Sequence, residues 1–221
     1  MCISADASFG ASAVLLVAGA IAIKKTKSRS ALVFASIPLL FATQQLIEGF
    51  MWMTLTNPDY YSMQKYPTYG FLFFALVVWP TIVPLSVYLL EQNKRLKKLQ
   101  LVFTIMGIML SVFMIITLLF YNVKASILTF HIHYDVEYPW ELPFLKGIVY
   151  FIPTAIPLFI SSVKRMKIFG AAIVLSFLVT NIYFRENNVS IWCFFAAIMS
   201  VIILSIVWKL NKSEKANSQY N

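Results

Sequence analysis

The feature that most constrains this chain is a succession of long apolar segments separated by short charged or aromatic stretches. A helix needs about 20 residues to cross a bilayer, so the shortest segments must borrow flanking residues. Only 12% of the residues are charged, whereas a soluble domain averages about 25%. We place seven segments along the chain: Phe9–Ile23, Ala31–Leu55, Tyr69–Leu90, Leu99–Tyr121, Leu142–Val163, Ile168–Phe184 and Val189–Leu210.

These segments predict an all-α polytopic integral membrane protein. Only helices and closed barrels satisfy their backbone hydrogen bonds in lipid, and the ten-residue alternation of barrel strands is missing from the apolar segments. We therefore expect one bundle of seven transmembrane helices over residues 1–210 and a short cytoplasmic tail over 211–221.

The basic residues predict the orientation of the bundle. Four Lys and Arg residues follow the first segment, four the third and three the fifth, and three more lie from Lys209 onward, which makes fourteen of the eighteen. Such clusters mark the cytoplasmic side, so we expect the N-terminus outside and the C-terminus inside a cell membrane, such as a bacterial inner membrane. The net charge of +9 thus reflects orientation and contact with anionic lipids, rather than nucleic-acid binding.

Three polar side chains interrupt the second segment, at Gln44, Gln45 and Glu48. At about 100° per residue, Gln45, Glu48 and Trp52 share one helix face, and Gln44 lies one turn before Glu48. An acidic residue inside a span costs about 2.5–3.5 kcal/mol on insertion scales and usually faces a bundle interior or a watery cavity. We therefore predict a ligand, proton or ion site in the outer third of the membrane. The alternative is a buried structural hydrogen-bond network.

Two polar residues at the outer end of the sixth segment could belong to the same site. Asn181 and Arg185 are one helical turn apart, and Arg185 is a candidate partner for Glu48 or Glu186. The alternative is ordinary interhelical hydrogen bonding next to an interfacial arginine.

The stretch between the fourth and fifth segments contains the two histidines of the chain. Residues 130–138 alternate strictly, with apolar residues on one face and polar residues on the other, namely His131, His133, Asp135 and Glu137. This pattern predicts a strand lying apolar face down over the outer mouth. Two histidines on one strand face lie about 7 Å apart and can chelate Zn²⁺ together with a carboxylate. A solvated polar face is the alternative.

Cys2 is expected on the same side of the membrane as these histidines. It is a further candidate metal ligand or nucleophile, a disulfide with Cys193 is a second interpretation, and a small residue packed at a helix start is a third.

A pair of prolines one turn apart occurs in the middle of two segments. Pro80 and Pro84 lie in the third, and Pro153 and Pro157 lie in the fifth. Each proline removes a backbone hydrogen bond, so both helices are expected to bend, and the echo indicates either a repeated helical hairpin or coincidence.

A resemblance rests on residues near the N-terminus. Met1-Cys2-x-Ser4-Ala5, followed by Pro38-x-x-Phe41-Ala42-x-Gln44-Gln45-x-x-Glu48-Gly49-x-x-Trp52, resembles an uncharacterised family of bacterial multi-span membrane proteins. Members typically open Met-Cys-Phe-Ser-Ala, and this chain has Ile3 in place of the phenylalanine. The resemblance covers about the first quarter of the chain. It implies a shared site at Cys2, Gln44, Gln45 and Glu48, and it supplies no reaction.

Three functions stay open on these observations. The first is an outward-facing site for a small ligand or ion, in a sensor or transporter. The second is an intramembrane metal-dependent hydrolase with Zn²⁺ as the metal, which uses His131, His133 and either Asp135 or Glu48, with Cys2 as a further candidate. The third is a structural subunit that partners another membrane protein.

Overall fold

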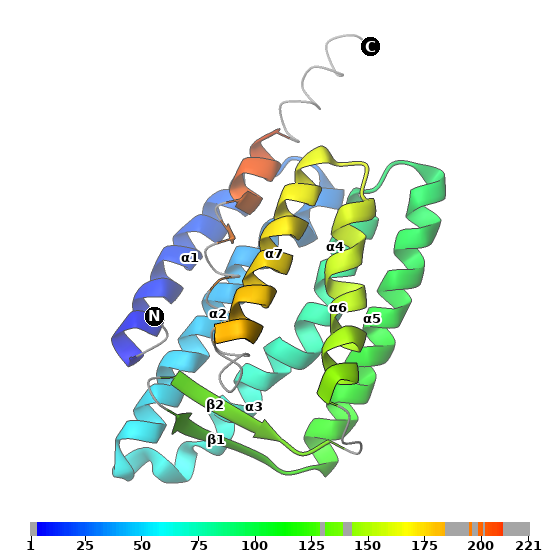
Figure 1. The fold of residues 1–221 in the computed structure, drawn as a ribbon. Helices are drawn as coiled ribbons and strands as arrows, with labels where there is room; N and C mark the ends of the chain where they lie inside the picture. Colours follow the sequence, from blue (N-terminus) through cyan, green and yellow to red (C-terminus); the bar gives the residue numbers. More distant parts are fainter. Residues whose placement is uncertain are drawn as a thin grey trace.

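The computed structural model describes residues 4–128, 131–138, 143–183, 195, 199–200 and 202–209. The chain is mostly helical, with one small sheet at one end of the bundle (Figure 1). The helices are α1 (Ala5–Lys25), α2 (Leu32–Thr56), α3 (Lys65–Phe73), α4 (Trp79–Leu90), α5 (Lys94–Phe120), α6 (Pro143–Ile160) and α7 (Lys164–Tyr183). Short 3₁₀ helices at Arg29–Ala31 and Pro58–Met63 precede α2 and α3, and residues 202–209 are also helical.

Among the described residues, four helical stretches are long and apolar enough to cross a membrane: Ala5–Lys25, Arg29–Thr56, Lys65–Leu90 and Lys94–Phe120. The third of these joins α3 to α4 through a π-helical turn at Phe74–Val78. A shorter apolar helix covers Gly147–Ile160. The predicted helical membrane protein is confirmed to that extent.

The fold class needs one correction, because an all-α fold leaves out a two-stranded antiparallel sheet. Strand β1 (Val123–Leu128) pairs with β2 (His131–Val136), with Ser126 opposite His133. The predicted alternating strand is confirmed as β2, in which Ile132 and Tyr134 are buried. Strand β1 was missed, although Val123, Ala125 and Ile127 alternate with more polar residues.

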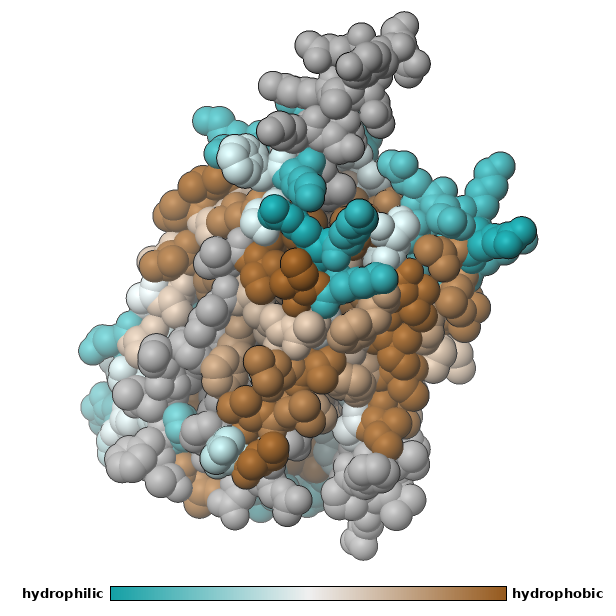
Figure 2. Space-filling view, turned by 45° about the horizontal axis from the view of Figure 1, so that its top comes forward, coloured by the Kyte–Doolittle hydropathy of each residue, from teal (hydrophilic) through white to brown (hydrophobic). Residues whose placement is uncertain are grey.

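The two ends of the bundle differ in composition. The hairpin end holds the sheet, the end of α2 and the start of α3, and the basic end holds the connections at 26–31, 91–93 and 161–163 (Figure 1). Figure 2 shows hydrophilic side chains gathered toward one end, beside a broad apolar surface on the helix sides. In the described part of the chain, twelve Lys and Arg residues lie at the basic end: Lys24, Lys25, Lys27, Arg29, Lys94, Arg95, Lys97, Lys98, Lys164, Arg165, Lys167 and Lys209.

Helices α1 and α2 run antiparallel in close contact (Figure 1). The Ser12 hydroxyl donates to the carbonyl oxygen of Ala42 at 2.8 Å, which fixes the register of the two helices. A Cβ atom on Gly19 would lie 2.5 Å from the Leu39 side chain, and one on Gly49 would overlap the Phe9 ring. Small residues therefore allow this close approach, as they do in other membrane helix pairs.

The two prolines of α4 shape its packing against α5 and α6. Pro84 has no N–H group, so the carbonyl of Pro80 lacks its usual helical donor, and that carbonyl packs against Gly107 of α5. Just before Pro80, hydroxyl groups of other helices bind the π-helical turn. Ser111 donates to the carbonyl of Val77 at 2.6 Å, and Tyr150 donates to that of Ala75 at 2.7 Å. The π-helical turn is thereby tied to both neighbouring helices.

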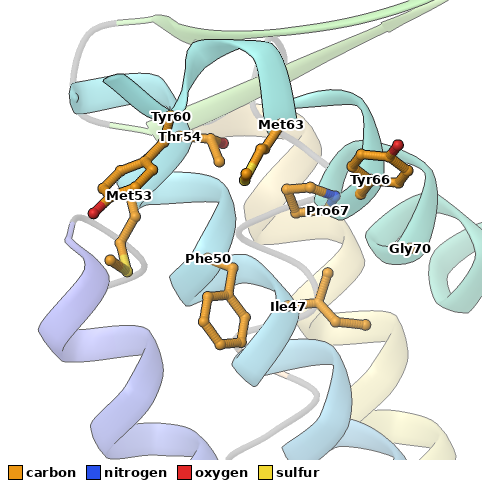
Figure 3. A pocket seen from close by; sticks show the side chains of 9 residues that line it. All are labelled: Ile47, Phe50, Met53, Thr54, Tyr60, Met63, Tyr66, Pro67 and Gly70. Carbon is orange, nitrogen blue, oxygen red and sulfur yellow. The ribbon is translucent and has the colours of Figure 1, made fainter. Parts of the chain in front are cut away.

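The hairpin packs its apolar face onto the helix ends. The Tyr134 ring stacks on Phe71 of α3, with ring centroids 4.7 Å apart. The Gln64 side chain donates to the carbonyl of Ala125 at 2.6 Å. Ile132 and Tyr134 belong to one buried cluster with Trp52. The sheet thus closes the hairpin end of the bundle beside Trp52. An apolar pocket at the same end is lined by side chains of α2, of the 3₁₀ helix Pro58–Met63 and of α3 (Figure 3).

Candidate functional site

The centre of the candidate site is a group of three buried polar side chains on α2. Gln44, Gln45 and Glu48 are each 0% exposed, although the helix that carries them is long and apolar enough to cross a membrane. The side-chain amide of Gln45 donates to Glu48 Oε2 at 2.9 Å. The structure therefore brings together the α2 residues that the sequence predicted, inside the bundle rather than facing lipid.

Trp79 joins this group from α4. Its indole Nε1 donates to Gln44 Oε1 at 2.8 Å, and its ring stacks on Phe41 with centroids 3.9 Å apart. Sequence analysis missed this residue. A tryptophan in the middle of an apolar segment was nevertheless a usable signal, because a buried indole N–H usually finds an acceptor.

Two buried donors near this group have no acceptor among the described residues. Trp52 is 5% exposed and its Nε1–H makes no hydrogen bond there, and the same holds for the hydroxyl of Ser8, which is 0% exposed. Unsatisfied buried polar atoms are rare in native structures, and each one calls for an explanation, such as a bound water or ion or a functional role.

Both donors lie close to the level of Glu48 along the bundle. Trp52 follows Glu48 by one helical turn on the same face of α2. On α1, Ser8 directly precedes Phe9, whose ring packs on Gly49, and it lies one turn before Ser12, which binds Ala42. The antiparallel register therefore places Ser8 opposite the stretch of α2 that contains Glu48.

The other predicted site residues fall partly outside the described residues. Cys2, Arg185 and Cys193 lie outside them, so the structure gives no account of these three. Asn181 lies in α7, and its side chain is also outside the description.

The histidines lie on β2 as predicted. His131 and His133 are half-buried, and Asp135 is exposed. Within the described ranges, no group of three or more His, Cys, Asp or Glu side chains could hold a metal ion. The histidines therefore lie on the closing sheet without a metal-binding cluster formed from described residues alone.

Sequence analysis also missed a second buried carboxylate, Glu91, at the basic end. Its oxygens accept hydrogen bonds from the Ser162 hydroxyl at 2.6 Å, from the Ser162 N–H at 2.8 Å and from the Asn93 N–H at 2.9 Å. Burial alone would raise the pKa of Glu91, but these hydrogen bonds and one from the Gln92 N–H lower it below its ordinary value of 4.5. Glu91 therefore joins the α4–α5 loop to the α6–α7 loop as an ionised acceptor.

Comparison with known proteins adds a family and little else. The model of one protein family matches residues 1–218, and the function of that family is unknown. No curated protein and no solved structure matches the chain. The residues of this chain are therefore the basis for the chemistry of the site.

Proposed function

This chain belongs to DUF6629, a family of unknown function, and from that starting point we propose that it is a membrane sensor or transporter that binds a small polar ligand or an ion at Glu48. The resemblance expected from the N-terminal residues agrees with the family match.

The membrane arrangement that we propose is the seven-span bundle, with the N-terminus outside and the C-terminus in the cytoplasm. Its support is the twelve described Lys and Arg residues at the basic end, against two, Lys65 and Lys124, whose described side chains lie at the hairpin end. In this orientation the hairpin end faces outward and Glu48 lies in the outer half of the bundle.

The observation that carries the proposal is a fully buried carboxyl group accompanied by donors that lack acceptors. Insertion of a charge into a span costs about 2.5–3.5 kcal/mol on insertion scales, so such a residue is a functional candidate by default. A purely structural network would be expected to satisfy its own members, whereas the indole of Trp52 and the hydroxyl of Ser8 find no acceptor among the described residues.

The donors and acceptors define the chemistry of the ligand. Glu48 supplies a carboxyl group that can hold a proton, a cation or a donor group of a ligand, while Trp52 and Ser8 supply hydrogen bonds to an acceptor atom. A hydrated cation or a small molecule with both kinds of group meets these needs. In this proposal Gln44 and Gln45 orient the carboxyl group, and the hairpin acts as the lid.

Infrared difference spectroscopy of the protein in nanodiscs tests this proposal, with protons and Na⁺ as the probes. A change of pH or the addition of Na⁺ should alter one carboxyl band of the wild-type protein that is missing from Glu48→Gln, while the bands of the other carboxyl groups respond alike in both proteins and the variant still inserts and purifies normally. The matched control is Glu137→Gln, which removes an exposed carboxylate from the hairpin and should leave the Glu48 signal in place.

Two results would contradict the assignment. One is a Glu48→Gln protein whose probe-dependent bands equal those of the wild type, which would make Glu48 a structural residue. The other is loss of the same bands in Glu137→Gln, which would locate the response on the hairpin.

A further inference from the structure

A crevice at the basic end lies between the last turns of α1 and the helical residues 202–209. It has a volume of about 350 Å³ and is lined by Ile21, Ala22, Lys25, Leu204, Ser205, Val207 and Trp208. The helical residues 202–209 lie beside the end of α1 (Figure 1), and Ile203, Ile206 and Val207 belong to the same buried cluster as Leu15 and Ala22. The crevice is therefore formed between two helical elements that pack against each other.

The lining of the crevice changes in polarity along the helix axes. Ile21 and Leu204 lie one helical turn deeper in the bundle than Lys25 and Trp208, which lie nearer the basic end. Lys25 is exposed, and Trp208 is 72% exposed. An apolar floor below a cation and an exposed indole matches the order of groups in a phospholipid, in which the acyl chain lies below a charged headgroup.

The charge around the crevice favours an anionic headgroup. Twelve described Lys and Arg residues lie at this end, and Glu91, the acidic residue described there, is 1% exposed and already hydrogen-bonded to Ser162. The guanidinium of Arg165 donates to the carbonyl of Ser205 at 3.0 Å, so a second cation backs the wall of the crevice.

We propose that this crevice binds one anionic phospholipid, with its phosphate near Lys25, its headgroup level marked by Trp208 and an acyl chain along Ile21 and Leu204. This inference rests on the membrane placement of the helices and does not depend on the site at Glu48. A lipid bound here would hold the C-terminal helical residues against α1.

Fluorescence quenching by brominated lipids tests this inference. The full chain is placed in phosphatidylcholine nanodiscs that contain either brominated phosphatidylglycerol or, in a second set, brominated phosphatidylcholine at the same mole fraction. Subtraction of the signal of Trp208→Phe isolates the emission of Trp208. We expect half-maximal quenching of Trp208 at a severalfold lower mole fraction of the anionic lipid than of the zwitterionic lipid.

A matched pair of lysine variants separates the crevice from the general surface charge. Lys25→Gln removes the lining cation, whereas Lys24→Gln removes an equally exposed neighbour that does not line the crevice. Any lysine near an anionic membrane surface contributes up to about fivefold through the surface potential, so we expect Lys24→Gln to raise the mole fraction of phosphatidylglycerol needed for half quenching by no more than about that factor. Lys25→Gln should raise it clearly more than Lys24→Gln does, because it also removes the direct contact with the phosphate.

Three results would overturn the inference. Equal quenching by the two lipids would remove the preference for an anionic headgroup. Equal effects of Lys24→Gln and Lys25→Gln would assign the preference to the whole surface. No quenching of Trp208 by either lipid would show that protein, rather than lipid, covers the crevice.

Discussion

Replacing Gly107 with alanine tests the contact between α4 and α5 at the double-proline kink. The new Cβ atom would overlap the carbonyl oxygen of Pro80 and lie 3.1 Å from Cγ of Pro84. A backbone oxygen cannot rotate away, so the two helices must move apart. Overpacking of this kind costs about 1–3 kcal/mol, and the upper part of that range applies to a backbone clash.

The helix propensity of alanine offsets part of this cost. Alanine is favoured over glycine in a helix by about 1 kcal/mol, which leaves a net loss of about 2 kcal/mol for Gly107→Ala. In a chain of this length 1 kcal/mol corresponds to about 2–4 °C in Tm, so we expect Tm to fall by about 4–8 °C. Thermal unfolding of the purified protein in detergent, followed by intrinsic fluorescence, measures the shift.

Gly10→Ala is the matched control, since nothing lies within 4 Å of a Cβ atom at that position of α1. It keeps the propensity gain without a clash, so its Tm should equal or exceed that of the wild type by up to about 4 °C. A Gly107→Ala protein as stable as Gly10→Ala would refute the close approach of the Pro80 carbonyl to α5.

Two further predictions concern the buried hydrogen bonds. Because its folded-state pKa is lowered below 4.5, Glu91 contributes stability that is fully present above that pH and is lost as the pH falls through the folded-state pKa. Glu91→Gln should therefore lower the free energy of unfolding at neutral pH by about 1–3 kcal/mol. As the pH is lowered, the Tm of this variant should fall less steeply than that of the wild type, and parallel curves of Tm against pH would contradict this. Trp79→Phe keeps an aromatic ring on Phe41 but removes the donor to Gln44, so it should cost about 1–3 kcal/mol in thermal unfolding, and an unchanged Tm would argue against that hydrogen bond.

The helices were predictable from the sequence because the length and composition of an apolar segment are local properties. The segment Ala31–Leu55 became α2 at Leu32–Thr56, and Leu99–Tyr121 became α5 at Lys94–Phe120. The helices begin or end several residues beyond some apolar segments, since capping groups such as Asn93 accept hydrogen bonds from the first turn of α5 and extend the helix into the polar flank.

The hairpin was only half predictable. Strict alternation from residue 130 to 138 indicated β2, because successive side chains point to opposite faces of a strand whichever strand it pairs with. Its partner β1 follows directly after a long apolar helix, and its own alternation is weaker. Pairing of two strands depends on contacts along both strands, which a pattern within one of them does not contain.

The candidate site was also only partly predictable from the sequence. Spacing on one helix predicted that Gln45 and Glu48 would lie together, and the hydrogen bond between them agrees with that spacing. The contributions of Trp79 and Ser8 come from other helices, and those depend on register and crossing, which are properties of packing rather than of any single segment. Glu91 was missed for a related reason, because its partner Ser162 lies 71 residues away.

The carboxylate of Glu91 has a mechanical consequence. By accepting hydrogen bonds from the Asn93 and Ser162 N–H groups, it links two interhelical turns to each other at one end of the molecule. Helices α4 and α5 therefore cannot slide past α6 and α7 at that end without breaking these hydrogen bonds. Any large rearrangement of these four helices must pivot there, and the greatest displacement will occur at the far end, where the hairpin rests.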